Sequence, residues 1–84
     1  MSETREEQLA RLTRLKVEAE AAYSKMYDVH TDIDIRLQFD LAEDFLLKAS
    51  RIARELGMDD EHTSIMARYQ HIRAVYRSQF RRPT

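Results

Sequence analysis

The sequence predicts an all-α fold, a three-helix up-down-up bundle in which a helical hairpin packs against a longer N-terminal helix. Apolar residues recur three or four positions apart over three long stretches, which is the spacing of one face of an α-helix. The 84 residues include one glycine and one proline, the two residues that disfavour helices most strongly. A chain of this length forms one domain, residues 1–84, with a thin hydrophobic core.

The first helix is expected over about residues 5–29, where Thr4 and Glu7 have the spacing of a capping box. It is predicted to be the longest helix, spanning roughly 37 Å against roughly 30 Å for each of the others. Its N-terminal leucines would then extend past the hairpin, and an exposed row of leucines favours association with a second chain. We therefore expect a homodimer formed through Leu9, Leu12, Leu15, Ala19 and Ala22.

The second helix is expected over about residues 36–56. Before it, β-branched residues and aspartates alternate between His30 and Asp34, and both kinds are mediocre in helix interiors. Ile35, Leu37 and Phe39 also alternate, which predicts a short extended or irregular segment before about Gln38. Thr31 or Asp34 is the candidate cap of this helix.

The third helix, about residues 60–80, follows a tight turn at Gly57. The only glycine of the chain comes directly after Leu56, where a helix ends on a residue of left-handed conformation. Asp59 or Asp60 is expected to cap the next helix. The apolar stripes of the two helices should meet at Leu46, Ala49, Tyr69 and Ile72.

The hairpin resembles a single tetratricopeptide repeat unit. Ala42, Leu46 and Ala49, followed by the residues ARELG, are similar to the second helix of a repeat and its exit turn, and Ile72 with Tyr76 is similar to part of the next repeat. The sequence departs from that family at Arg73, where the family has a small residue. One repeat cannot bury a continuous solenoid core, so the resemblance implies a helical hairpin.

Residues 52–57 also resemble the first helix and turn of a helix-turn-helix DNA reader. The positions that would contact bases are then Asp59, Asp60, Glu61 and His62. Three carboxylates there would be repelled by the phosphates of DNA, so this sequence argues against such a reader.

Composition excludes several other classes of protein. The net charge of −1 argues against a polyanion as the obvious partner. The absence of cysteine excludes disulfides and thiol chemistry, and makes the reducing cytoplasm the expected location. The polar, acidic N-terminal residues do not have the pattern of a signal peptide, and no apolar run is long enough to span a membrane.

No constellation for catalysis, metal binding or a cofactor emerges from the spacing of reactive residues. His30, His62 and His71 are expected to be solvated or hydrogen-bonded histidines. The aspartates around His30 alternate as in a calcium loop, but Ile33 and Phe39 stand where that loop needs glycine and glutamate. We expect no enzyme activity, no cofactor and no metal.

The last predicted helix carries an arginine ridge next to aromatic residues. Arginine and aromatic side chains are enriched at the centres of protein interfaces, so this face is a candidate partner-binding surface. It consists of Arg73, Tyr76, Arg77, Phe80 and Arg81. The arginines also suit the carboxyl end of a helix without any partner.

The predicted function is a small cytoplasmic protein-protein interaction module, an adaptor or regulator that self-associates. The alternative is a nucleic-acid-binding regulator that uses the arginine ridge.

Overall fold

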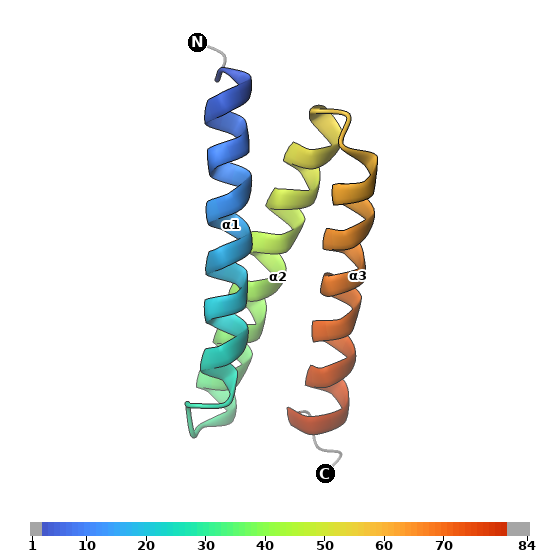
Figure 1. Cartoon of the computed structure of the whole chain (residues 1–84). Helices are drawn as coiled ribbons and strands as arrows, with labels where there is room; N and C mark the ends of the chain where they lie inside the picture. Colours follow the sequence, from blue (N-terminus) through green and yellow to red (C-terminus); the bar gives the residue numbers. More distant parts are fainter. Residues whose placement is uncertain (1–2, 81–84) are drawn as a thin grey trace.

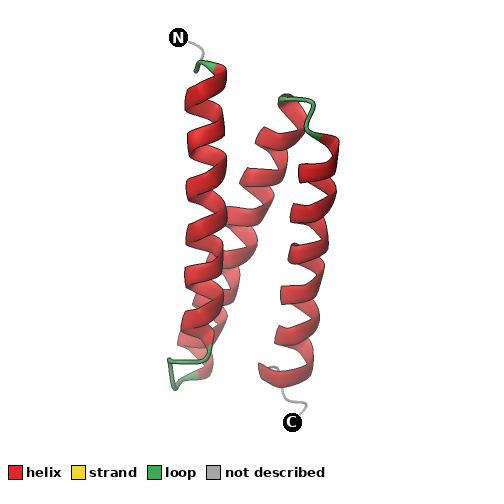
Figure 2. Cartoon of the chain, in the orientation of Figure 1, coloured by secondary structure: helices red, strands yellow, loops and turns green. Residues whose placement is uncertain are grey.

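The computed structural model describes residues 3–80 and confirms the all-α three-helix bundle. Helices α1 (Arg5–Met26), α2 (Asp32–Glu55) and α3 (Asp59–Val75) each run antiparallel to the one before, and α2 lies between the other two (Figures 1 and 2). The last described turn, η1 (Tyr76–Phe80), is π-helical. Within the described residues α1 and α2 make the most extensive contacts, and α3 packs mainly on α2.

Helix α1 begins as predicted and ends earlier. The Thr4 hydroxyl accepts a hydrogen bond from the backbone N–H of Glu7 at 3.1 Å, and the Glu7 carboxylate accepts one from Thr4 N at 3.3 Å. This capping box fixes the start of the helix at Arg5. The helix stops at Met26, whereas the sequence stripe suggested Val29.

Helix α2 begins four residues before the predicted position, because Thr31 caps it. The Thr31 hydroxyl accepts a hydrogen bond from Asp34 N at 3.0 Å, and Asp32 and Asp34 lie in the first turn, where carboxylates suit the positive end of the helix dipole. The expected extended segment before Gln38 is therefore wrong. At 24 residues α2 is longer than α1, which has 22, so the expectation that the first helix is the longest is also wrong.

The turn between α2 and α3 has the predicted left-handed glycine. Gly57 has a φ of +72°, Met58 N donates to the carbonyl of Ala53 at 2.9 Å, and Gly57 N donates to that of Arg54 at 3.0 Å. These two bonds define a Schellman motif, and Met58 packs back on the core as its apolar contact. The expected aspartate cap is wrong: Asp59 and Asp60 already lie inside the first turn of α3.

Replacing Gly57 with valine is expected to lower the free energy of unfolding by about 1 kcal/mol or more. No atom lies within 4 Å of the position that a Cβ would take, so the loss comes from backbone strain at positive φ. Chemical denaturation measures it. Gly57→Asn should lose clearly less, because asparagine tolerates this conformation, and equal losses for the two variants would contradict the explanation.

The core is a single cluster along the axis of the bundle. It includes the predicted hairpin contacts Leu46, Ala49 and Ile72, with Tyr69 packed against its edge. Alanines occupy much of the cluster on α1 and α2: Ala19, Ala22, Ala42, Ala49 and Ala53. Small side chains let two helix backbones approach closely, which agrees with the extensive α1–α2 contact.

Candidate functional site

The predicted arginine surface is only partly assembled. Arg73, Tyr76 and Arg77 line one groove of about 170 Å³ together with residues of α2: Arg36, Phe39 and Glu43. The rings of Phe39 and Tyr76 meet edge to face, with centroids 4.0 Å apart. Three guanidinium groups thus lie around an aromatic pair. The sequence predicted the members of this surface from the third helix, but not those from α2.

Two of these arginines are already engaged by neighbouring side chains. Nε of Arg73 lies 3.6 Å from a carboxylate oxygen of Glu43, and its NH1 donates a hydrogen bond to the Tyr69 hydroxyl at 3.0 Å. Nε of Arg36 lies 3.1 Å from Asp40 Oδ1, and this hydrogen bond raises the pKa of the Arg36 guanidinium. Arg77 is exposed. The groove is therefore less cationic than its arginines alone would make it.

Phe80 lies apart from this groove. Its ring packs edge to face on Tyr27, the residue that caps the end of α1, with centroids 5.0 Å apart. The helical turn that carries it is π-helical, and the wider turn changes the direction of side chains relative to a continuous α-helix. Arg81, the last member of the predicted surface, lies outside the described residues.

The expected exposed leucine row on α1 is wrong. Leu12, Leu15, Ala19 and Ala22 are buried in the core of the single chain, and Leu9 is half-buried against it. The physical reason is the early start of α2 at Asp32, which makes α2 long enough to lie alongside α1 over most of its length. Four of the five residues predicted for the α1 dimer are therefore not exposed to a second chain.

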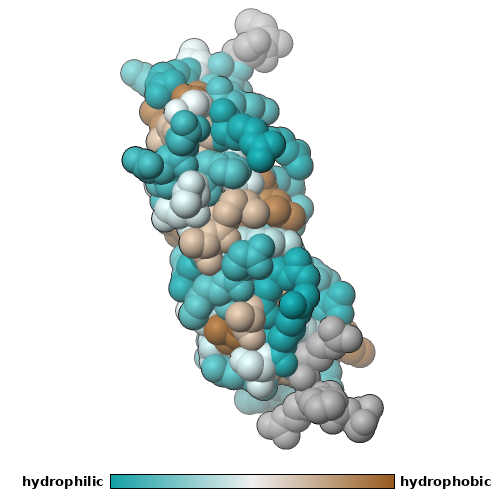
Figure 3. All heavy atoms as spheres, turned by 90° about the vertical axis from the view of Figure 1, so that its right-hand side faces the viewer, coloured by the Kyte–Doolittle hydropathy of each residue, from teal (hydrophilic) through white to brown (hydrophobic). Residues whose placement is uncertain are grey.

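Apart from Val17 of α1, the exposed large aliphatic residues among residues 3–80 lie on α2. Ile33 is 81% exposed, Leu37 53%, Leu47 39% and Leu41 37%. They share the side of α2 that faces away from its buried residues, since the helical repeat places them opposite Ala42, Leu46 and Ala53. We call these four residues the α2 outer face. The side of the bundle on which α3 lies is mostly hydrophilic, with small separated hydrophobic patches (Figure 3).

A second groove, of about 480 Å³, lies between α1 and α2. Its walls carry four cations and two carboxylates, and its floor is apolar. The lining residues are Arg11, Arg14, Leu15 and Glu18 of α1 with Lys48, Arg51, Ile52 and Glu55 of α2. This groove has no recognisable signal in the sequence, because its cations come from two helices and neither helix has a conspicuous arginine series there.

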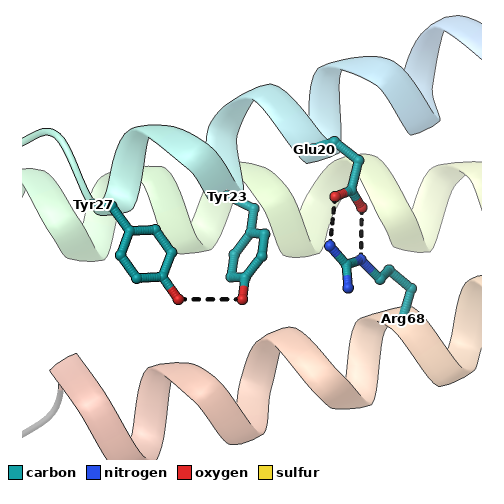
Figure 4. A network of polar contacts seen from close by, with 4 residues as sticks. All are labelled: Glu20, Tyr23, Tyr27 and Arg68. Carbon is teal, nitrogen blue, oxygen red and sulfur yellow. Dashed lines mark hydrogen bonds and ion pairs between the residues drawn. The ribbon is translucent and has the colours of Figure 1, made fainter.

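Polar side chains connect α1 to α3 (Figure 4). The Arg68 guanidinium donates two hydrogen bonds to the Glu20 carboxylate, Nε to Oε2 at 2.8 Å and NH2 to Oε1 at 2.6 Å. Arg68 also lies over the Tyr23 ring, 5.1 Å from its centroid, and Lys16 pairs with Glu61. The hydrogen bonds from Arg68 hold the pKa of Glu20 below its ordinary value. This bidentate pair fixes where α3 lies relative to α1.

Glu20→Gln is expected to lower stability by about 0.5–1 kcal/mol at neutral pH, because the pair is largely exposed to solvent. The folded-state pKa of Glu20 is depressed, so its contribution is present above the unfolded value near 4.5 and is lost as the pH falls through the folded value. The difference between parent and variant should therefore disappear in acid. Thermal unfolding at neutral pH and near pH 2 measures it.

Glu18→Gln is the control for this pair, since Glu18 is an exposed glutamate of the same helix without an ion pair among residues 3–80. A Glu20→Gln deficit that persists unchanged in acid would contradict the role of the carboxylate charge.

Among residues 3–80, no group of three histidine, aspartate or glutamate side chains is placed to hold a metal ion. In the same part of the chain, no helix has the length and apolar character needed to cross a membrane. The three histidines are dispersed, and His71 lies edge to face with Tyr23 at a centroid distance of 6.4 Å.

Comparison of the chain with protein-family models, curated proteins and solved structures finds no match. The function of the chain is therefore inferred from the geometry of these surfaces.

Proposed function

We propose that the chain is a small protein-protein interaction module that forms a homodimer through the α2 outer face. The observation that carries the proposal is the exposure of four large aliphatic side chains in line on one helix: Ile33, Leu37, Leu41 and Leu47. Isolated exposed aliphatic residues are normal, whereas an aligned series on one helix is typical of a surface that a partner helix covers.

The pattern of the α2 outer face is complementary to itself. Ile33 and Leu47 lie equally far from Asp40 in the sequence, on opposite sides, and so do Arg36 and Asp44. If two copies of α2 pair antiparallel about a two-fold axis at Asp40, each Ile33 meets Leu47 of the second copy. Each Arg36 then meets Asp44 of the second copy.

Such a dimer brings aliphatic side chains and the two Asp40 carboxylates together at its axis. Leu37 and Leu41 flank the axis from both copies, and burial of aliphatic surface is the main favourable contribution to association. The carboxylate of Asp40, at the axis, is already paired with Arg36 of its own helix. Lys48 is paired with Asp44, so both flanks of the interface carry ion pairs that can rearrange between copies.

Sedimentation velocity over a concentration series tests the dimer. The parent chain should change from a 10.0 kDa species to twice that mass as its concentration rises. Leu37→Lys should weaken the dimer strongly, whereas Val17→Lys should not, since Val17 is an exposed aliphatic residue of α1 outside the face. A 10.0 kDa species at every concentration up to hundreds of micromolar would overturn the proposal.

A charge exchange tests the antiparallel register. Arg36→Asp alone places two carboxylates against each other at both ends of the interface and should weaken the dimer. Combining it with Asp44→Arg restores opposite charges and should recover much of the association. A double variant that dimerises no better than the single one would contradict this register.

Nucleic-acid binding through α3 is the second candidate function. The observation in its favour is the groove where Arg36, Arg73 and Arg77 surround the aromatic pair Phe39 and Tyr76. The ion pairs of Arg36 and Arg73 with carboxylates weigh against it. Salt-dependent retention on heparin or single-stranded RNA, lost in Arg77→Gln, would favour this function over the first.

For either function we propose the cytoplasm as the location, because a chain without cysteine suits a reducing compartment.

A further inference from the structure

The groove between α1 and α2 has its charges in a definite order. The two helices are antiparallel, so residues at the start of α1 lie opposite residues at the end of α2. From one end of the groove to the other, the wall of α1 carries Arg11, Arg14 and Glu18. In the same direction, the wall of α2 carries Glu55, Arg51 and Lys48. Each end of the groove therefore has one cation and one carboxylate. The middle has two arginines, Arg14 and Arg51, on opposite walls.

The two central arginines differ from the other cations of the groove in having no carboxylate partner. Arg11 pairs with Glu3 at 3.0 Å, and Lys48 pairs with Asp44 at 2.8 Å. Neither Arg14 nor Arg51 forms an ion pair with any residue in the range 3–80. At the end of the same groove, Nε of Arg11 is buried without a hydrogen-bond acceptor. The groove thus concentrates donors and positive charge that the chain itself does not satisfy.

We propose that this groove binds a small molecule that carries one phosphate monoester group, held between Arg14 and Arg51. A guanidinium presents two parallel N–H donors that match two oxygens of a phosphate. Two arginines on opposite walls can contact the same phosphate from both sides and compensate its two negative charges. Arg51 follows Leu47 of the α2 outer face by one helical turn, whereas Arg14 belongs to α1, so the proposal depends on the groove and not on the dimer.

The carboxylates at the two ends limit which anions fit. Glu18 and Glu55 would each repel a second phosphate placed along the groove, so an extended polyanion is disfavoured there. The volume of about 480 Å³ is in the usual range for small-molecule sites, which is about 300–1,000 Å³. Leu15 and Ile52 form the floor, so the remainder of the ligand would contact apolar side chains.

Isothermal titration of the full chain with phenyl phosphate tests the site, with inorganic phosphate as the second probe. We expect saturable binding of one phenyl phosphate per chain. Arg14→Gln and Arg51→Gln should each weaken it about tenfold or more, the usual effect of losing a hydrogen bond to a charged group. Inorganic phosphate should bind the same residues more weakly, because it lacks the apolar part.

Arg54→Gln is the matched control, since Arg54 is an exposed arginine of the same helix that does not line the groove. It changes the net charge equally and should leave the affinity unchanged. Arg51→Lys keeps the charge and removes the paired donors, and should also weaken binding. Circular dichroism of each variant establishes that it remains folded.

Three results would overturn the proposal. One is an absence of saturation by phenyl phosphate. Another is an equal loss of affinity in Arg54→Gln, which would indicate a general electrostatic attraction. The third is tighter binding of a short oligonucleotide than of phenyl phosphate, because the end carboxylates should disfavour an extended polyanion.

Discussion

Replacing Ile72 with alanine is expected to lower the free energy of unfolding by about 2–5 kcal/mol. Ile72 is 1% exposed and is one of the two largest side chains that the fold buries completely, the other being Met26. Removing its outer carbons forfeits their burial and leaves a cavity that the surrounding helices fill only in part. A domain of 84 residues typically has about 4–13 kcal/mol of stability in total, so the loss is a large share.

Urea denaturation followed by far-UV circular dichroism measures this loss. All variants are compared at one protein concentration, since dimer formation would otherwise change the apparent stability. Ile72→Val should cost about 0.5–1.5 kcal/mol, and Val17→Ala, at an exposed position, should change little. An Ile72→Ala variant as stable as the parent would mean that α3 does not pack on α2 through this residue.

The sequence predicted the core well because burial follows helical periodicity. The spacing of Leu46, Ala49 and Ile72 placed each of them correctly on a buried stripe. The turn at Gly57 was also predictable, since a single glycine after an apolar helix has one favoured conformation, and the observed φ of +72° confirms it. These features depend on local chemistry that a single sequence contains.

The first interhelix connection was predicted less well because residue preferences depend on position in a helix. Threonine and aspartate are poor in helix interiors, which suggested an irregular segment after Val29. The same residues are favoured at a cap and in a first turn, and Thr31, Asp32 and Asp34 occupy those positions. The earlier start of α2 then buried Leu12 and Leu15, and this removed the reason for expecting a dimer through α1.

The α2 outer face had a sequence signal that was interpreted otherwise. Ile33, Leu37 and Leu41 recur at helical spacing, but the alternation of Ile35, Leu37 and Phe39 favoured an extended segment. The α1–α2 groove had no such signal. Bringing Arg14 opposite Arg51 depends on how the two helices are rotated against each other, which follows from packing and not from the period of either helix.

The π-helical turn at the end of α3 is a further feature without a sequence signal. The stripe through Tyr76 and Phe80 continues the α-helical period, yet the backbone widens there. As a result Tyr76 contacts Phe39 of α2, while Phe80 contacts Tyr27 just after the end of α1. The predicted arginine surface was divided for this reason.

Replacing Ala49 with leucine is expected to destabilise the chain by about 1–3 kcal/mol, for the opposite reason to Ile72→Ala. Ala49 is 0% exposed and belongs to a core in which α1 and α2 contribute five buried alanines. A larger side chain there must separate helices or adopt a strained rotamer, since the small residues leave no space for it.

Ala67→Leu is the matched control, because Ala67 is an exposed alanine of α3. Alanine and leucine have similar helix propensities, so the exchange itself should change helix stability little. Urea denaturation should show a clear loss for Ala49→Leu and almost none for Ala67→Leu. Equal stability of both variants would show that the core around Ala49 has more space than its full burial implies. A loss confined to Ala49→Leu would support close packing of the helices around this alanine.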